Sequence, residues 1–85
     1  MPYKVEFRPA AARAVRKLAE DVRARIVKAI DLLAEDPRHP GVRRLRGGRN
    51  EYRIRVGEYR VLYEIDDLVL IVLVVEVGHR RDVYR

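Results

Sequence analysis

The segment YRIRVGEYRVLYEI, residues 52–65, constrains the fold more than any other part of the chain. Apolar or aromatic side chains alternate with charged ones on both sides of Gly57-Glu58, and this period of two is typical of paired β-strands. A glycine in a two-residue connection supplies the positive φ that a tight hairpin turn requires. The sequence therefore predicts a β-hairpin in which Arg55 and Arg60 face each other across the two strands.

The two faces of this predicted hairpin differ in character. The face expected to join the core carries Tyr52, Ile54, Val56, Tyr59, Val61 and Tyr63. The other face carries Arg53, Arg55 and Arg60. Arginines that face each other on neighbouring strands repel, and this repulsion costs stability. We therefore expect the arginine face to bind an anion.

Positive charge is concentrated in the same part of the chain. Eight of the 19 Lys and Arg residues lie in residues 38–60 beside only two carboxylates, so this segment alone accounts for the net charge of +6. A solvated surface or adaptation to heat could also enrich arginine. A concentration of one sign is nevertheless typical of proteins that bind a polyanion, most often nucleic acid. In the loop and the tail we predict RNA-binding roles for Arg44, Arg46, Arg49 and Arg81.

The N-terminal half of the chain predicts one strand and two helices. Residues 3–8 alternate between apolar and charged side chains, as in a half-buried strand. Apolar residues then recur at helical spacing from Pro9 to about Ala19 and from about Asp21 to Glu35. Asp21 is expected to cap the second helix. The short connection between the helices favours a helical hairpin.

The C-terminal half completes a predicted sheet. Residues 36–50 are rich in proline and glycine and predict a loop. After the β-hairpin, Asp66-Asp67 predicts a turn, and residues 68–77 predict a strand ended by Gly78. This strand is apolar on both faces, so we expect it to lie centrally in the sheet or to be covered on both sides. The order is β-α-α-β-β-β. We expect a single α+β domain over residues 1–85, with the helical hairpin packed on one face of a four-stranded, largely antiparallel sheet.

Several residue types required by common enzyme chemistries are missing. The chain has no cysteine, serine or threonine, which excludes thiolate metal sites and Ser-His-Asp catalysis. Its two histidines lie far apart, and no carboxylate cluster accompanies the arginine face, so we expect no metal and no cofactor. Neither a signal peptide nor a membrane span is recognisable. We expect a soluble, cytoplasmic protein with no membrane partner.

The remaining cationic and aromatic residues suit cleavage of RNA without metal. In such a reaction the 2′-hydroxyl attacks the adjacent phosphate, negative charge builds on the phosphoryl oxygens and the 5′-oxygen leaves. Arginines can bind these oxygens, the imidazole of His79 could transfer a proton, and Tyr84 could stack on a base. Simpler interpretations stay open, with His79 as a strand-end histidine and Tyr84 as an anchor for the tail.

Three segments resemble the RelE/ParE toxin superfamily, specifically its RelE-type mRNA interferases. They are YKVEFRPAAARAVRKL, LRGGRNEYRIRVGEYRVLYEI and VLVVEVGHRRDVYR, which follow the family order and are distributed along nearly the whole chain, from Tyr3 to Arg85. The resemblance implies the β-α-α-β-β-β fold and metal-independent cleavage of mRNA in the ribosomal A site, which inhibits translation. It also implies control by a cognate, acidic, RelB-like antitoxin in a hetero-oligomeric complex.

The resemblance also implies roles for individual residues. The positions that match family site residues are Arg53, Arg55, Arg60, Arg80 and Tyr84. At Arg53 and Arg55, RelE-type enzymes often carry lysine. Because a guanidinium stays protonated at neutral pH, an arginine is a poor proton acceptor. If a family lysine shares in proton transfer, His79 or Tyr84 takes that role here.

Two other classes of function compete with the interferase. A ParE-like toxin, or a degenerate relative, would bind another target such as DNA gyrase and would not cut RNA. A general RNA-binding module would bind free RNA tightly and with steep salt dependence. The interferase hypothesis instead predicts that free RNA is a poor substrate, because the ribosome orients the message.

Overall fold

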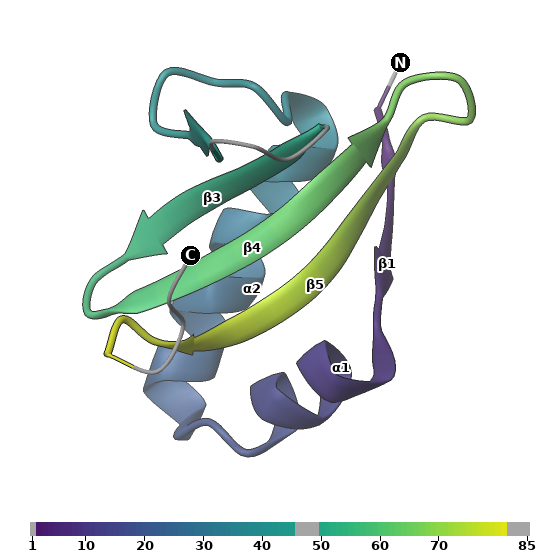
Figure 1. Cartoon of the computed structure of the whole chain (residues 1–85). Coiled ribbons are helices and arrows are strands. Elements are labelled where there is room, and N and C mark those ends of the chain that lie inside the picture. Colours follow the sequence, from purple (N-terminus) through teal and green to yellow (C-terminus); the bar gives the residue numbers. More distant parts are fainter. Residues whose placement is uncertain (1, 46–49, 82–85) are drawn as a thin grey trace.

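Two helices pack on one face of a five-stranded sheet in this protein (Figure 1). The computed structural model describes residues 2–45 and 50–81 of the chain. No helix in these residues is long and apolar enough to cross a membrane. The strand order in the sheet is β1-β5-β4-β3-β2. In chain order the elements are β1 (Lys4–Phe7), α1 (Pro9–Arg16), α2 (Glu20–Glu35), β2 (Arg43–Arg44), β3 (Glu51–Val56), β4 (Tyr59–Asp66) and β5 (Ile71–His79).

The predicted α+β class is confirmed, whereas the predicted strand count is wrong by one. The additional strand is β2, which lies inside the segment predicted as a loop and pairs antiparallel with β3. Two residues are too few to show any period, so no alternation marks this strand in the sequence. The β3–β4 and β4–β5 pairs are antiparallel, and β1 runs parallel to β5.

The hairpin of β3 and β4 has the predicted register and the predicted core face. Arg55 stands opposite Arg60, and Gly57 in the turn has a φ of 60°. On the helix side, the side chains of both strands meet those of α1, α2 and β5. The resulting core contains Ala11, Val15, Ile26, Ile30, Leu33, Tyr52, Ile54, Val61, Tyr63, Ile65, Val72, Val74 and Val77.

Several predicted boundaries move in the structure. α1 ends at Arg16 rather than near Ala19, and α2 begins at Glu20 after Ala19, which makes no side-chain cap. Asp21 therefore lies in the first turn of α2, where its negative charge interacts favourably with the positive end of the helix dipole. β5 spans Ile71–His79 rather than residues 68–77, and Gly78 pairs with β4 instead of ending the strand.

The predicted interior position of β5 is confirmed, and this strand contains an irregularity with consequences for the site. β5 lies between β1 and β4. Tyr63 of β4 stands opposite Val74, whereas Leu62 stands opposite Glu76, so β5 has one extra residue at this point. An extra residue of this kind is a β-bulge, which reverses the faces of the residues that follow it. Val77 consequently joins the core beside Val74, three positions away.

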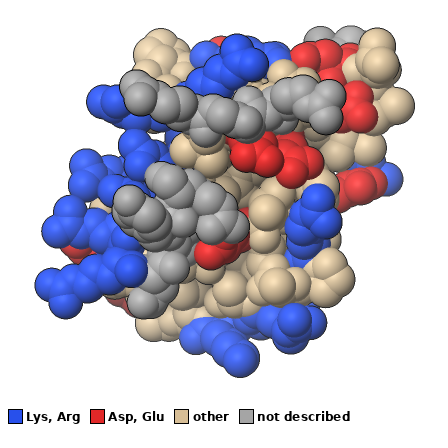
Figure 2. Space-filling model, in the orientation of Figure 1, with Lys and Arg blue, Asp and Glu red and all other residues tan. Residues whose placement is uncertain are grey.

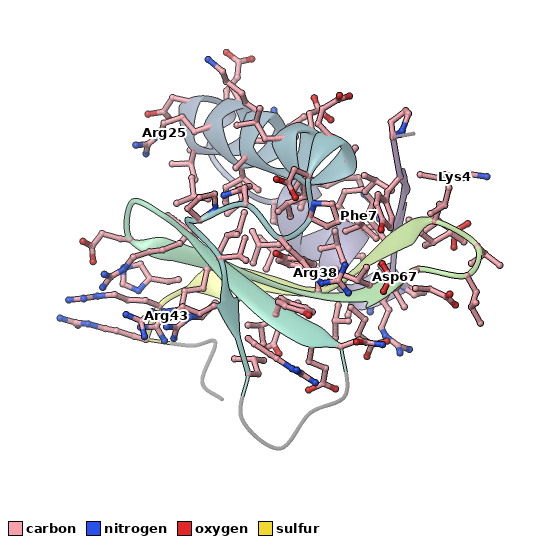
Figure 3. The ribbon with its side chains drawn as sticks, turned by 90° about the horizontal axis from the view of Figure 1, so that it is seen from above. Lys4, Phe7, Arg25, Arg38, Arg43 and Asp67 are labelled. Carbon is pink, nitrogen blue, oxygen red and sulfur yellow. The ribbon has the colours of Figure 1, made fainter. Side chains whose placement is uncertain are left out.

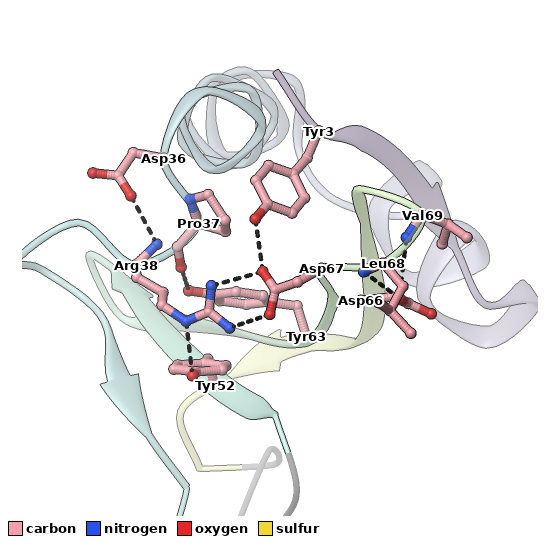
Figure 4. A network of polar contacts seen from close by, with 10 residues as sticks. All are labelled: Tyr3, Asp36, Pro37, Arg38, Tyr52, Tyr63, Asp66, Asp67, Leu68 and Val69. Carbon is pink, nitrogen blue, oxygen red and sulfur yellow. Dashed lines mark hydrogen bonds and ion pairs between the residues drawn. The ribbon is translucent and has the colours of Figure 1, made fainter. Parts of the chain in front are cut away.

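A network of polar contacts joins the loop after α2 to the turn after β4 (Figure 4). The guanidinium of Arg38 donates to both carboxylate oxygens of Asp67, over 2.9 and 2.8 Å, and its Nε donates to the hydroxyl of Tyr52 over 3.0 Å. Tyr3 also donates to Asp67, over 2.7 Å. These two donors, Arg38 first, lower the pKa of Asp67 to about 2. We refer to Tyr3, Arg38, Tyr52 and Asp67 as the Arg38 clamp.

Candidate nucleic-acid interface

An open hollow of about 230 Å³ lies on the face of the sheet that carries no helix. Arginines from three neighbouring strands line it. In Figure 2, which shows this face, Lys and Arg gather on the side of β3 and its turn, whereas Asp and Glu lie mainly towards the turn between β4 and β5. The lining residues are Gly41, Arg43, Arg53, Arg55 and Arg60. We refer to the four arginines as the arginine hollow.

Strand register brings the four guanidinium groups together. Arg53 and Arg55 alternate with core residues along β3, so both point away from the helices. Arg60 of β4 stands opposite Arg55, and Arg43 of β2 stands opposite Arg53. Across the sheet from Arg60 in the other direction is Gly78, which has no side chain to occupy the space beside it.

The arginine hollow is not neutralised by carboxylates in the described part of the chain. Ion pairs there join Arg8 to Glu64, Arg38 to Asp67 and Arg80 to Glu58, and none involves the hollow. The Nε of Arg60 is buried and has no hydrogen-bond acceptor among the described residues. A buried donor without an acceptor is unfavourable.

Arg53 shows the electrostatic effect of the cluster. Its pKa is lowered, first by partial burial and then by the positive charges of Arg60, Arg43 and Arg55. Arginine remains protonated at neutral pH even so, because its ordinary pKa lies far above neutral. The lowered pKa therefore reflects burial first and the positive potential of the neighbouring arginines second, and a bound anion would relieve the second of these.

His79 lies on the opposite face of the sheet from the arginine hollow. It stands across from Tyr59, a helix-side residue, and the two rings meet edge to face with centroids 5.5 Å apart. The Nδ1 of His79 accepts a hydrogen bond from the backbone N–H of Arg81 over 3.2 Å. The bulge in β5 causes this placement, because alternation from Val74 without an extra residue would put His79 on the arginine face.

Arg80 and Arg81 follow β5 and are both exposed. The Nε of Arg80 lies 2.9 Å from a carboxylate oxygen of Glu58, and its backbone N–H donates to the carbonyl of Glu58 over 2.8 Å. These two contacts hold Arg80 at the tip of the β3–β4 hairpin. The structure therefore places Arg80 at the hairpin turn, outside the residues that line the arginine hollow.

The other predicted RNA-binding residues divide into two groups. Arg44 is exposed, but it stands opposite the core residue Tyr52 and so projects to the other side of β2 from Arg43. Arg46, Arg49 and the predicted catalytic Tyr84 lie outside the described residues. Arg43 could not be singled out from the sequence, because the register of β2 decides which of the two adjacent arginines faces the hollow.

The described ranges contain no candidate metal centre. No group of three or more His, Asp or Glu residues there is arranged to hold an ion. The guanidinium groups of the arginine hollow can bind and polarise anionic oxygens.

Comparisons with known proteins place the chain in a family. A family model described as "ParE toxin of type II toxin-antitoxin system, parDE" matches residues 5–84. The chain belongs to the RelE/ParE family of type II toxins. This RelE/ParE-family toxin is 37% identical over 86 residues to toxin RelG of Mycobacterium tuberculosis, and the match covers 100% of this chain and 99% of that relative.

Two further relatives extend the comparison. The mRNA interferase toxin RelE of Escherichia coli K12 is 33% identical over 82 residues, which cover 94% of this chain and 85% of the relative. The crystal structure of the toxin–antitoxin complex RelBE2 from Mycobacterium tuberculosis contains a chain that matches with a TM-score of 0.81 and 34% identity. That match covers 94% of this RelE/ParE-family toxin and 100% of the other chain.

Proposed function

We propose that this toxin is a metal-independent endoribonuclease that cleaves mRNA in the ribosomal A site and so inhibits translation. The arginine hollow carries the proposal, because it gathers four guanidinium groups without an ion pair to a described carboxylate. One relative, from Escherichia coli, is an mRNA interferase toxin, and this supports RNA as the anion that binds in the hollow. The ribosome as the place of action implies a cytoplasmic protein.

In the proposed reaction the hollow stabilises developing charge. The 2′-hydroxyl of the message attacks the adjacent phosphorus, and the bond from phosphorus to the 5′-oxygen breaks. The non-bridging oxygens gain negative charge in the transition state, and Arg53, Arg55 and Arg60 would bind them more strongly there than in the ground state. Fixed guanidinium groups favour this step because they are in position before the charge develops.

Proton transfer requires a group other than arginine. The bulge in β5 turns His79 to the helix side, where its ring packs against Tyr59. We therefore assign His79 a structural role and propose Tyr84 as the residue that exchanges a proton with the reacting oxygens. Arg80, held at the hairpin turn by Glu58, would contact the phosphate from the side of the tail.

A cognate antitoxin is the proposed regulatory partner. The RelBE2 structure that matches this chain is a toxin–antitoxin complex. The net charge of +6 favours an acidic antitoxin, because opposite charges accelerate association and fix the relative orientation of two proteins. An antitoxin that covered the arginine hollow would prevent RNA from entering it.

Cleavage on programmed ribosomes tests the proposed function. Purified toxin is added to ribosomes with a defined mRNA codon in the A site, in the presence of a chelator, and cuts are mapped by primer extension. Wild type should cut within the A-site codon and leave ribosome-free RNA intact. Arg80→Ala should lose cleavage, whereas Glu58→Ala, which removes the same ion pair but keeps the arginine, should retain most of it.

Each contrary result has a defined meaning. Equal losses in Arg80→Ala and Glu58→Ala would show that Arg80 acts by holding the hairpin turn, not by contacting phosphate. Efficient cutting of free RNA would contradict ribosome dependence. Absence of cutting by a folded wild-type protein would favour a ParE-like toxin with another target, such as DNA gyrase.

A further inference from the structure

We propose that Arg43 binds the backbone phosphate next to the one that reacts, so that the arginine hollow holds at least two successive phosphates of an RNA strand. This inference rests on the proposed function for the identity of the polyanion. Its structural basis is independent of the reaction: Arg43 lines the hollow together with Arg53, Arg55 and Arg60. Figure 3, with the helices above the sheet, shows Arg43 on the opposite side from the helix residue Arg25.

The number of charges favours more than one phosphate. A phosphodiester carries one negative charge, whereas the hollow presents four guanidinium groups and, in the described ranges, no carboxylate paired with them. Two strand spacings of about 5 Å and two residue steps of about 3.4 Å separate the backbone of Arg43 from that of Arg60. Arg43 and Arg60 thus occupy the two ends of the cluster, where different phosphates of one strand can bind.

The local structure holds Arg43 in position although its neighbours repel it. Val42, directly before it, packs against the core. The backbone N–H of Leu45 donates to the carbonyl of Glu51 over 2.8 Å, which extends the pairing of β2 with β3. The two-residue strand β2 is thereby fixed at both ends. Within it, Arg43 faces Arg53, and the charge of Arg43 helps to lower the pKa of Arg53.

Gly41 supports the same arrangement at the edge of the hollow. Its backbone N–H donates to Nδ1 of His39 over 3.0 Å, and the His39 ring lies against it. A Cβ at position 41 would come within 2.9 Å of His39 Cε1, so a side chain there would displace the ring. Glycine at this position, which also lines the hollow, allows the tight turn before β2.

Arg44 provides a matched control for the test. It adjoins Arg43, is also exposed and carries the same charge, but it stands opposite Tyr52 on the other side of β2. Arg43→Ala and Arg44→Ala therefore remove the same charge from the same short strand. A purely electrostatic role of the strand predicts equal effects, whereas the proposal predicts an effect of Arg43→Ala alone.

The experiment measures binding of a short single-stranded RNA that is 2′-O-methylated and therefore cannot be cleaved. Its dissociation constant is determined by fluorescence anisotropy over a series of salt concentrations. Arg43→Ala should weaken binding about tenfold, the effect of one charge-assisted contact. It should also reduce the slope of log K against log salt by about 0.7, the value for one phosphate of a single strand. Arg44→Ala should change neither quantity, and Arg43→Lys should restore the slope.

Ligands with one neutral linkage locate the contact. Single phosphates of the same RNA are replaced in turn by uncharged methylphosphonates. The effect of Arg43→Ala should disappear when the phosphate beside the reacting position is neutral and should persist when the reacting phosphate itself is neutral. An effect of Arg43→Ala that is independent of every single replacement would overturn the assignment, as would equal slopes for Arg43→Ala and Arg44→Ala.

This binding assay separates the present inference from the proposed function. It requires neither ribosomes nor cleavage. A wild-type protein that fails to cut on ribosomes would refute the proposed function, but the binding assay would still decide whether Arg43 binds a phosphate. Wild-type binding without salt dependence would refute Arg43 as a phosphate ligand. Thermal unfolding of Arg43→Ala serves as the folding control, and no loss of stability is expected because the substitution relieves repulsion from Arg53.

Discussion

The Arg38 clamp and the arginine hollow use the same residue type from the same arginine-rich segment in opposite ways. Arg38 has two carboxylate oxygens and a tyrosine hydroxyl as acceptors, and its guanidinium lies 5.4 Å from the centre of the Tyr52 ring. The arginines of the hollow have one another as neighbours. The difference arises from Asp67, which lies 29 residues from Arg38 in sequence and, among the described arginines, pairs with Arg38 alone.

This comparison separates arginines that stabilise the fold from arginines available for binding. The Arg38–Asp67 pair is about half exposed, so solvent screening limits its Coulomb energy. Its main contribution is to join four segments of the chain, since Tyr3 and Tyr52 bind the same pair. The arginines of the hollow form no ion pair with a described carboxylate, and their positive charges repel one another. This is typical of sites where function is favoured over stability.

The largest expected effect is a contrast between two alanine variants. Replacing an arginine of the hollow should reduce cleavage, whereas replacing Arg38 of the clamp should reduce stability. Arg60→Ala should lower single-turnover cleavage on ribosomes by about 100-fold, the effect of removing one transition-state donor, without loss of stability. Arg38→Ala should lower the free energy of unfolding but leave cleavage per folded molecule unchanged. Cleavage assays and chemical denaturation of both variants provide the test, and an unfolded Arg60→Ala protein would contradict its placement outside the core.

A smaller effect is expected where a buried tyrosine supports the loop that carries Arg38. The hydroxyl of Tyr63 donates to the carbonyl of Pro37 over 2.7 Å in the interior. Tyr63→Phe should destabilise the protein by about 1–2 kcal/mol, because the carbonyl loses its donor without gaining access to water. Urea denaturation measures this loss, and cleavage per folded molecule should stay unchanged. A variant as stable as wild type would show that water replaces the hydroxyl.

The smallest predicted effect is the dependence of the Arg38 clamp on pH. The folded-state pKa of Asp67, about 2, lies below its ordinary value of 3.8, so its ionised form stabilises the fold. That contribution is complete above the unfolded-state pKa, near 4, and is lost as the pH falls towards 2. Asp67→Asn should therefore be less stable than wild type at pH 6, and the difference should shrink on acidification. A difference that stays constant down to pH 2 would contradict the role of ionised Asp67.

Local features made much of the fold predictable. The alternation in residues 52–65 and the glycine in the turn determine the hairpin, its register and the face on which Arg53, Arg55 and Arg60 lie. Helical spacing likewise located both helices to within a few residues. These signals work because they depend on neighbours in the sequence, where side-chain direction follows from the period of the backbone.

The extra strand and the bulge could not be predicted in the same way. β2 exists because its two residues pair with β3, and its register selects Arg43 rather than Arg44 for the hollow. The bulge in β5 turns His79 away from the arginines that it was expected to join. Both features depend on hydrogen bonds to a partner strand, and no residue within either segment reports the position of that partner.

The sequence by itself determined the α+β fold class, the two-faced hairpin and the concentration of arginine on and around it. Only the tertiary structure decided which arginines pair with a carboxylate. It also decided which arginines stand together without an ion pair to a described carboxylate. The physical reason is that the net effect of a charge depends on what lies within a few ångströms of it. Asp67 comes within that distance of Arg38 only because the turn after β4 and the loop after α2 meet at the same end of the sheet.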